Sequence, residues 1–142
     1  MDFKLYREYG ALNSVPIFDA FEQGLKNLGH RTVDSNEDVA VIWSVLWSGR
    51  MLGNSRIYNA CRYSNKPIII IEVGNLIRNK TWRLSLDHIN SLGYFGNQEN
   101  LDTTRPQKLG VSLKDIRIHR RPEILIAAQH QQSLQWEGQP PM

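Results

Sequence analysis

Two apolar runs stand out along the chain, VAVIWSVL at residues 39–46 and PIIIIEV at residues 67–73. Each run leads into a polar loop that contains glycine. A strand that is apolar on both faces must be covered on both faces, which is typical of a parallel sheet packed between helices. We therefore expect both runs to be central strands of such a sheet. Ligands of these sheets bind outside the carboxyl ends of the strands, so the two loops are the first place to look for chemistry.

Weaker patterns surround the two runs. Alternating polar and apolar residues predict a strand within residues 2–9, and residues 30–33 read as a short second strand. Ser14 is a good N-cap for a helix that ends at Gly29, and Asn54 or Ser55 can cap a second helix that stops before Pro67. This alternation of strands and helices predicts an α/β fold, with a doubly wound, mostly parallel Rossmann-like sheet flanked by helices.

Beyond residue 74 the pattern becomes less regular. Trp82, Leu84 and Leu86 alternate with polar residues and predict a short strand with one buried face. Residues 97–108 read as an exposed loop, and residues 124–128 (ILIAA) form another apolar run. The sequence then ends in a polar, glutamine-rich stretch.

Length and composition limit the classes of protein to consider. A chain of 142 residues suits one domain, and 41% hydrophobic with 22% charged residues is ordinary for a globular protein. We find neither a membrane span nor the layout of a secretion signal. Cys61 is the single cysteine, which excludes an internal disulfide and suits a small buried side chain in a helix. We expect a cytoplasmic protein that does not bind a membrane.

Charge and motifs exclude several kinds of ligand. The net charge of +3 is mild, and the one basic cluster, residues 117–121 with Arg117, His119, Arg120 and Arg121, reads as a solvated turn rather than a nucleic-acid site. The sequence has no dinucleotide or Walker motif, no metal-ligand spacing and no serine-hydrolase elbow. We therefore expect no cofactor, no metal and no nucleic-acid partner.

The loop after the first apolar run carries the most suggestive polar residues. Arg50 follows a glycine at the expected start of a helix, where free N–H groups attract anions and an arginine can clamp a phosphate or carboxylate. The alternative is that Arg50 pairs with a nearby acid and holds the loop. Trp47 is the tryptophan best placed to stack on a ligand. The candidate ligand-binding residues of this loop are Trp47, Ser48, Gly49 and Arg50.

Candidate catalytic groups follow the second run. Glu72 is the only charge in its strand, beside Gly74, and a buried carboxylate there suits a general base; a salt bridge to Arg50 or Arg78 is the alternative. Asp87, His88 and Asn90 offer an acid, a base and an amide, although neighbours on a strand face opposite sides.

Several of these segments resemble a known family. The runs at 29–33, 39–43 and 67–74 are similar to the N-terminal half of GT-B-type glycosyltransferases. Four shorter motifs resemble uncharacterised glycosyltransferase-like proteins of bacterial and marine phages, namely EVG at 72–74, TW at 81–82, HIN at 88–90 and YFG at 94–96. The resemblance extends over residues 3–136.

The resemblance implies a division of labour within a two-domain cleft. In that family the front half holds the acceptor and the back half holds the nucleotide-sugar. Residues 1–121 would form the acceptor-side domain, and residues 122–142 a linker with the first strand of a second half, or a tail. Arg50, Glu72 and Asn90 would line the cleft, and Glu72, Asp87 or His88 would deprotonate an acceptor hydroxyl. We expect the chain to be catalytically incomplete alone, with nucleotide-sugar bound only where a second half exists.

A binding role is the alternative from a different class. The chain would then be a non-enzymatic, flavodoxin-like binding or assembly module, in which the loops bind a small anion or a partner. Its C-terminal tail would pair with a neighbouring chain and form a homo-oligomer.

Overall fold

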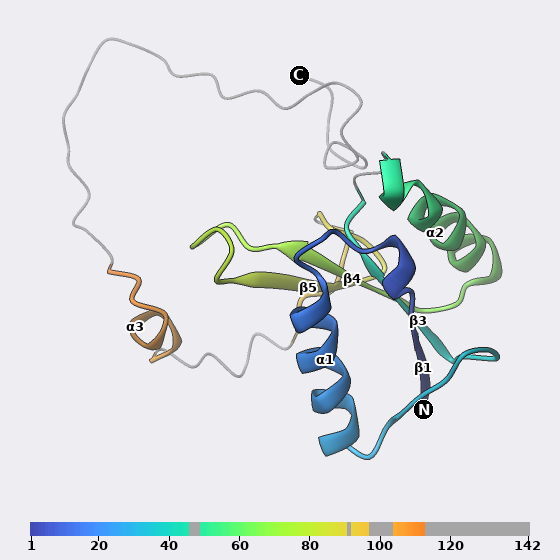
Figure 1. The fold of residues 1–142 in the computed structure, drawn as a ribbon, viewed down its shortest axis with the longest axis horizontal. Helices are drawn as coiled ribbons and strands as arrows, with labels where there is room; N and C mark the ends of the chain where they lie inside the picture. Colours follow the sequence, from blue (N-terminus) through green and yellow to red (C-terminus); the bar gives the residue numbers. More distant parts are fainter. Residues whose placement is uncertain (46–48, 91, 97–103, 113–142) are drawn as a thin grey trace, which may run out of the picture.

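The computed structural model describes residues 1–45, 49–90, 92–96 and 104–112, which form a five-stranded sheet with helices on its faces (Figure 1). The strands lie in the order β2-β1-β3-β4-β5. The first four are parallel, and β5 runs antiparallel to β4. The predicted α/β class and the mostly parallel sheet are therefore confirmed. The strands are β1 (Asp2–Leu5), β2 (Arg31–Thr32), β3 (Val39–Trp43), β4 (Ile68–Val73) and β5 (Trp82–Leu86).

The two apolar runs form the centre of the sheet, as predicted. All five residues of β3 are buried, and β3 pairs with β1 on one side and β4 on the other. β3 is shorter than the apolar run at residues 39–46 that predicted it, because Ser44 adopts a left-handed conformation (φ +63°) that ends the extended backbone. Full burial of an Ile or Val side chain is worth about 1.5–3 kcal/mol, so these two strands supply much of the folding free energy.

One face of the sheet is covered by α1 (Val15–Asn27). Phe18 and Leu25 of this helix pack against Val41 and Trp43 of β3. The expected end at Gly29 is confirmed: its φ is +77° and its N–H donates to the carbonyl of Lys26. Ser14 is the N-cap residue of α1, as predicted, but the expected bond from its hydroxyl is missing. The buried Ser14 hydroxyl makes no capping bond, and the helix instead begins with the Ser14 carbonyl accepting from residues 17 and 18.

The other face is covered by α2 (Leu52–Ser64). Tyr58 and Cys61 pack against Ile42, Ile70 and the loop residue Ile89. Cys61 is thus the buried side chain that its position predicted. The helix begins two residues before the expected cap, at Leu52, so Asn54 lies within its first turn.

The last strand departs from the expectation of one buried face. β4 and β5 form a hairpin whose tip projects away from both helices in Figure 1. Leu84, expected inside, is 47% exposed, whereas the polar Ser85 is 3% exposed. Gly74 permits the hairpin: its N–H donates to the Thr81 carbonyl, and a Cβ there would lie 2.6 Å from that oxygen. β5 is the edge strand beside β4. Leu84 is exposed because α1 covers β4 but does not extend over Leu84 of β5.

The remaining predictions concern residues after β5. The expected loop 97–108 includes α3 (Arg105–Lys108), a single helical turn. The basic cluster at 117–121 and the apolar run at 124–128 lie outside the described residues. Within the described segments, no helix has the length and apolar character that crossing a membrane requires.

Candidate functional site

The carboxyl ends of β3 and β4 meet through Glu72. Its Oε1 accepts hydrogen bonds from the Ser44 hydroxyl (2.9 Å) and from the backbone N–H of Val45 (3.0 Å). The carboxylate therefore holds the turn that follows β3. Glu72 also lies directly opposite Arg83 in the β4–β5 register. Two hydrogen bonds to one carboxylate oxygen tie Glu72 to the turn and give it a structural role.

The loop after β3 brings a helix start to this edge. A 3-10 turn, η2 (Gly49–Met51), precedes α2, and Gly49 has a φ of +53° that suits glycine. The N-cap residue of α2, Met51, makes no side-chain capping bond, and the first turn of the helix carries no acidic residue. Arg50 is exposed and makes no ion pair with the described residues. The predicted ligand residues Trp47 and Ser48 lie outside the described residues.

Asn54 joins the ends of two strands beneath that helix start. Its side chain is fully buried, and Nδ2 donates to the carbonyl of Trp43 at the end of β3. The same nitrogen donates, at 3.2 Å, to the carbonyl of Tyr9 in η1 (Arg7–Tyr9), the turn that follows β1. Gly53 is needed beside it, because a Cβ at this position would lie 2.3 Å from the Tyr9 ring. The helix start is therefore fixed to the boundary between β1 and β3.

Asp87 lies at the opposite end of the sheet from Glu72. Its Oδ1 accepts from the N–H of Ile68, the first residue of β4, and its own N–H donates to the Ile68 carbonyl. Glu72 follows Ile68 by four positions in the same strand, so the two carboxylates are separated by about 13 Å along β4. The antiparallel direction of β5 causes this separation.

His88 and Asn90 stay with Asp87 at that end. The His88 ring is 2% exposed, and its Nδ1 accepts from the N–H groups of Ile89 (3.0 Å) and Asn90 (3.3 Å). The ring also packs edge-on against Tyr58, with centroids 6.3 Å apart. Asn90 Oδ1 accepts from the N–H of Leu92. The predicted site residues thus form two groups, one with Glu72, Gly74, Gly49 and Arg50, the other with Asp87, His88 and Asn90.

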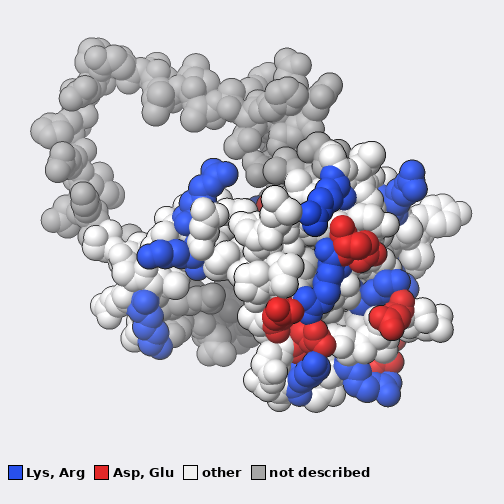
Figure 2. All heavy atoms as spheres, in the orientation of Figure 1, with Lys and Arg blue, Asp and Glu red and all other residues white. Residues whose placement is uncertain are grey.

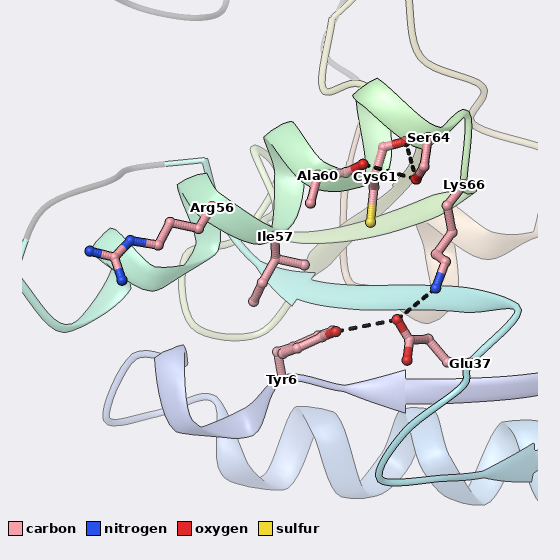
Figure 3. A pocket seen from close by; sticks show the side chains of 8 residues that line it. All are labelled: Tyr6, Glu37, Arg56, Ile57, Ala60, Cys61, Ser64 and Lys66. Atoms are coloured by element: carbon pink, nitrogen blue, oxygen red, sulfur yellow. Dashed lines mark hydrogen bonds and ion pairs between the residues drawn. The ribbon is translucent and has the colours of Figure 1, made fainter.

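A separate hollow lies between β1 and α2, with a volume of about 270 Å³ (Figure 3). Its floor includes Ile57, Ala60 and Cys61 of α2. Across it, the Glu37 carboxylate accepts from the Tyr6 hydroxyl (3.3 Å) and from Lys66 Nζ (3.0 Å). The hollow is therefore lined on one side by apolar and polar side chains of α2, and on the other by three side chains linked through hydrogen bonds.

The environment of the hollow changes the acidity of the groups that line it. Burial, together with the neighbouring Glu37 carboxylate, raises the pKa of Tyr6 to about 12. Burial works against ionisation of Glu37, but a backbone hydrogen bond and the Lys66 ammonium together hold the pKa of its carboxyl below the usual value. Burial raises the pKa of the Cys61 thiol. At neutral pH, Tyr6 is therefore neutral and Glu37 is a carboxylate that accepts hydrogen bonds from Tyr6 and Lys66.

The sequence analysis missed Tyr6, Glu37 and Lys66. They lie 29 and 31 positions apart along the chain, so no local spacing links them. Asn54 was considered only as a helix cap, since its two carbonyl partners belong to segments that the sequence does not show to be adjacent. Among the described residues, no group of three histidine, cysteine or acidic side chains could hold a metal ion.

Charges of both signs are mixed around α1. Figure 2 shows acidic and basic side chains interspersed on the part of this face where α1 lies. Arg7 pairs there with Asp19 and Glu22, and Lys26 also pairs with Glu22. Such mixing gives no extended field of one sign on that region.

Comparison with known proteins returned no significant match: no family model, curated protein or solved structure is significantly similar to this chain.

Proposed function

We propose that this chain is a binding module that takes the anionic group of a small molecule at the start of α2. The strand order β2-β1-β3-β4-β5 supports a doubly wound, flavodoxin-like arrangement. Ligands of that arrangement bind at the carboxyl edge, between the two strands where the order reverses, which here are β1 and β3. The observation that carries the proposal is Asn54, which ties the start of α2 to that boundary.

The electrostatics of this position favour an anion. Backbone N–H groups in the first turn of a helix lack intrahelical partners, and the helix dipole adds to their positive potential. Arg50 lies next to them, exposed, in a turn that Gly49 opens. A phosphate or carboxylate would be bound by N–H groups of the first turn and by the Arg50 guanidinium.

A binding experiment with two arginine variants tests the proposal. Inorganic phosphate, a uridine nucleotide and a nucleotide-sugar are titrated in turn into the full chain by calorimetry at low salt. We expect at least one of them to bind, and R50Q to weaken that binding about tenfold, since an exposed charge-assisted contact is worth on the order of 1.5 kcal/mol. R62Q, in the last turn of the same helix, should bind within about twofold of the unmodified chain, as expected for the far end of the dipole.

Two results would contradict the proposal. One is that none of the three compounds binds. The other is equal weakening by R50Q and R62Q, because a general loss of positive charge would then explain the effect.

A second candidate is the acceptor-binding half of a nucleotide-sugar-dependent glycosyltransferase, which would hold a saccharide or another hydroxyl compound. Glu72 favours it, because its carboxylate lies at the carboxyl end of a central strand, where ligands of such sheets bind, and it would act there as a general base on an acceptor hydroxyl. Asp87 and His88 contribute less to this proposal, since they sit about 13 Å away at the other end of β4.

Acceptor binding distinguishes the two candidates. A saccharide panel without nucleotide is titrated into the full chain, and E72Q is compared with E8Q, an exposed control in η1. Saccharide binding that E72Q weakens and E8Q leaves unchanged would establish the second candidate. Binding of the anionic compounds with no saccharide bound would support the first.

A further inference from the structure

The connection between β2 and β3 is short for its topology. Both strands are parallel to β1 and lie on either side of it, yet only six residues, 33–38, join them. Connections between parallel strands usually need a dozen or more residues, most often with a helix. Glu37 of this segment bonds to Tyr6 and Lys66, so the segment passes β1 on the side of the sheet where α2 lies. It supplies no helix there, and the hollow lies between it and α2.

The hollow has the size of a compound with a single ring. Its volume is about 270 Å³. Pockets for drug-sized ligands measure about 300–1,000 Å³, so the hollow is too small for most of them. A cavity of about 150 Å³ is already large enough for benzene. A six-membered ring with one small substituent therefore fits the hollow.

The apolar part of the wall comes from α2 and from the end of β1. Ile57 and Cys61 point from α2 toward the strands in Figure 3, and both line the hollow. The Tyr6 ring packs with the same cluster of side chains. Arg56 also borders the hollow, but its guanidinium points away from Tyr6 in Figure 3. A bound ring would therefore have apolar contacts on both of its faces.

The polar part of the wall is a carboxylate with an ammonium beside it. The Glu37 side chain is only 10% exposed, and its Oε1 accepts from both the Tyr6 hydroxyl and Lys66 Nζ. An ammonium has three N–H donors. Among the described residues, Glu37 is the side chain that accepts from Lys66. Further donors of Lys66 are therefore available to an oxygen atom of a bound molecule.

The charges of this pair select a neutral oxygen atom. The pKa of the Glu37 carboxyl lies below its usual value, so Glu37 is ionised at neutral pH. A ligand carboxylate bonded to Lys66 Nζ would lie close to Glu37 Oε1, which is 3.0 Å from that nitrogen, and the two negative charges would repel each other. A ligand ammonium would be repelled by Lys66 in the same way. A hydroxyl avoids both costs, since it can accept from an ammonium and donate to a carboxylate.

We propose that the hollow binds a small neutral ring compound that carries a hydroxyl group. The ring packs against Ile57, Cys61 and Tyr6, and the hydroxyl oxygen accepts from Lys66 Nζ. This site is separate from the anion position at the start of α2. It lies along the middle and the end of that helix, and it disfavours the anions that the other position would bind.

A comparison of three probes tests the proposal in the full chain. Phenol, toluene and benzoate share one ring and differ in the group attached to it. Each is titrated while the alkylation of Cys61 by iodoacetamide is timed, since Cys61 is the single cysteine of the chain and lines the hollow. We expect phenol to slow alkylation about threefold or more at saturation, because a bound ring covers the thiol. Toluene and benzoate should bind about fivefold more weakly, because each lacks the neutral oxygen that accepts from Lys66.

Two outcomes of that comparison would overturn the proposal. One is that phenol gives no protection. The other is that toluene or benzoate protects Cys61 as well as phenol does, because the hydroxyl would then not be recognised.

Two matched variants test the part played by Lys66. K66M removes its ammonium, and K26M removes a lysine that also pairs with a glutamate, but on α1 at the other face of the sheet. We expect K66M to weaken phenol binding about fivefold and to leave toluene binding within about twofold, whereas K26M keeps the preference for phenol. The readout is the ratio of the two affinities, which a general loss of stability does not change. A preference for phenol that survives in K66M, or that K26M also removes, would overturn the proposal.

Discussion

The centre and the edges of the sheet are stabilised in different ways. At the centre, β3 is buried along its whole length, with one helix on each face. At one edge, β2 has only two residues; an ion pair between Arg31 and Asp2 holds it to β1, and a hydrogen bond from the Thr32 hydroxyl to Glu22 holds it to α1. At the other edge, β5 keeps an exposed leucine and three buried polar atoms without hydrogen-bond partners, Trp82 Nε1, Arg83 Nε and Ser85 Oγ. Apolar burial thus fixes the centre, whereas individual polar contacts decide how firmly each edge is held.

The candidate ligand position, at the start of α2, lies beside the well-packed centre of the sheet. Asn54 and Glu72 both anchor the carboxyl end of β3, one from α2 and one from β4. A ligand at the start of α2 would therefore meet a rigid support, which is what precise positioning requires.

The largest expected effect lies at the centre. I42A should lower the free energy of unfolding by about 2–5 kcal/mol, because a fully buried side chain leaves a cavity between β3 and α2. I42V should cost only about 0.5–1.5 kcal/mol. Urea denaturation of both variants gives the two values. A cost below about 1 kcal/mol for I42A would mean that the centre is not the main source of stability.

The next effect concerns the anchor at the end of β3. N54A should cost about 1–3 kcal/mol, since the buried carbonyl of Trp43 and the partly buried carbonyl of Tyr9 lose this donor. S55A is a suitable control in the same turn, because the Ser55 hydroxyl bonds only to the exposed carbonyl of Leu52. Thermal unfolding of both variants measures the difference. Equal melting temperatures would show that Asn54 is not an anchor.

The free energy of unfolding should depend on pH through Glu22, which holds the β2 edge to α1. Hydrogen bonds from Lys26 and Thr32, aided by Arg7, lower the pKa of Glu22 to about 2 from an ordinary 4.5. A lowered folded-state pKa contributes stability that is fully present above pH 4.5 and is lost as the pH falls toward 2. E22Q should reduce the stability lost between pH 6 and pH 2.5 by about 1 kcal/mol, as expected for a partly exposed network. Urea midpoints between pH 6 and pH 2.5, with E8Q as the control, show whether the slope changes.

The smallest effect compares two serines that are equally buried, each 3% exposed. The Ser44 hydroxyl donates to Glu72, so S44A should cost about 1 kcal/mol. The Ser85 hydroxyl in β5 has no partner, so S85A should change stability by less than about 0.5 kcal/mol, or raise it. A larger cost for S85A than for S44A would reverse the comparison between centre and edge.

The sequence predicted the centre of the fold better than its edges. Continuous apolar runs identify β3 and β4, because their short length, their β-branched residues and the flanking glycine and proline favour a buried strand over a buried helix. The direction of β5 could not be predicted, since alternation is the same in a parallel and an antiparallel strand. That direction decides where Asp87 and His88 lie, so the predicted site residues were separated by a feature that periodicity does not encode. The hollow at Tyr6, Glu37 and Lys66 depends on contacts between distant segments, and it was missed for the same reason.

The hairpin between β4 and β5 also has a consequence for the order of folding. Its two strands are joined by residues 74–81, and its contacts are therefore local in the sequence. Hairpins form in about 1–10 μs, whereas each parallel pair here needs a crossover to close first. We expect β4 and β5 to pair early and to present the edge of β4 to β3. The strand with the least cover in the finished sheet would then be among the first to gain a partner.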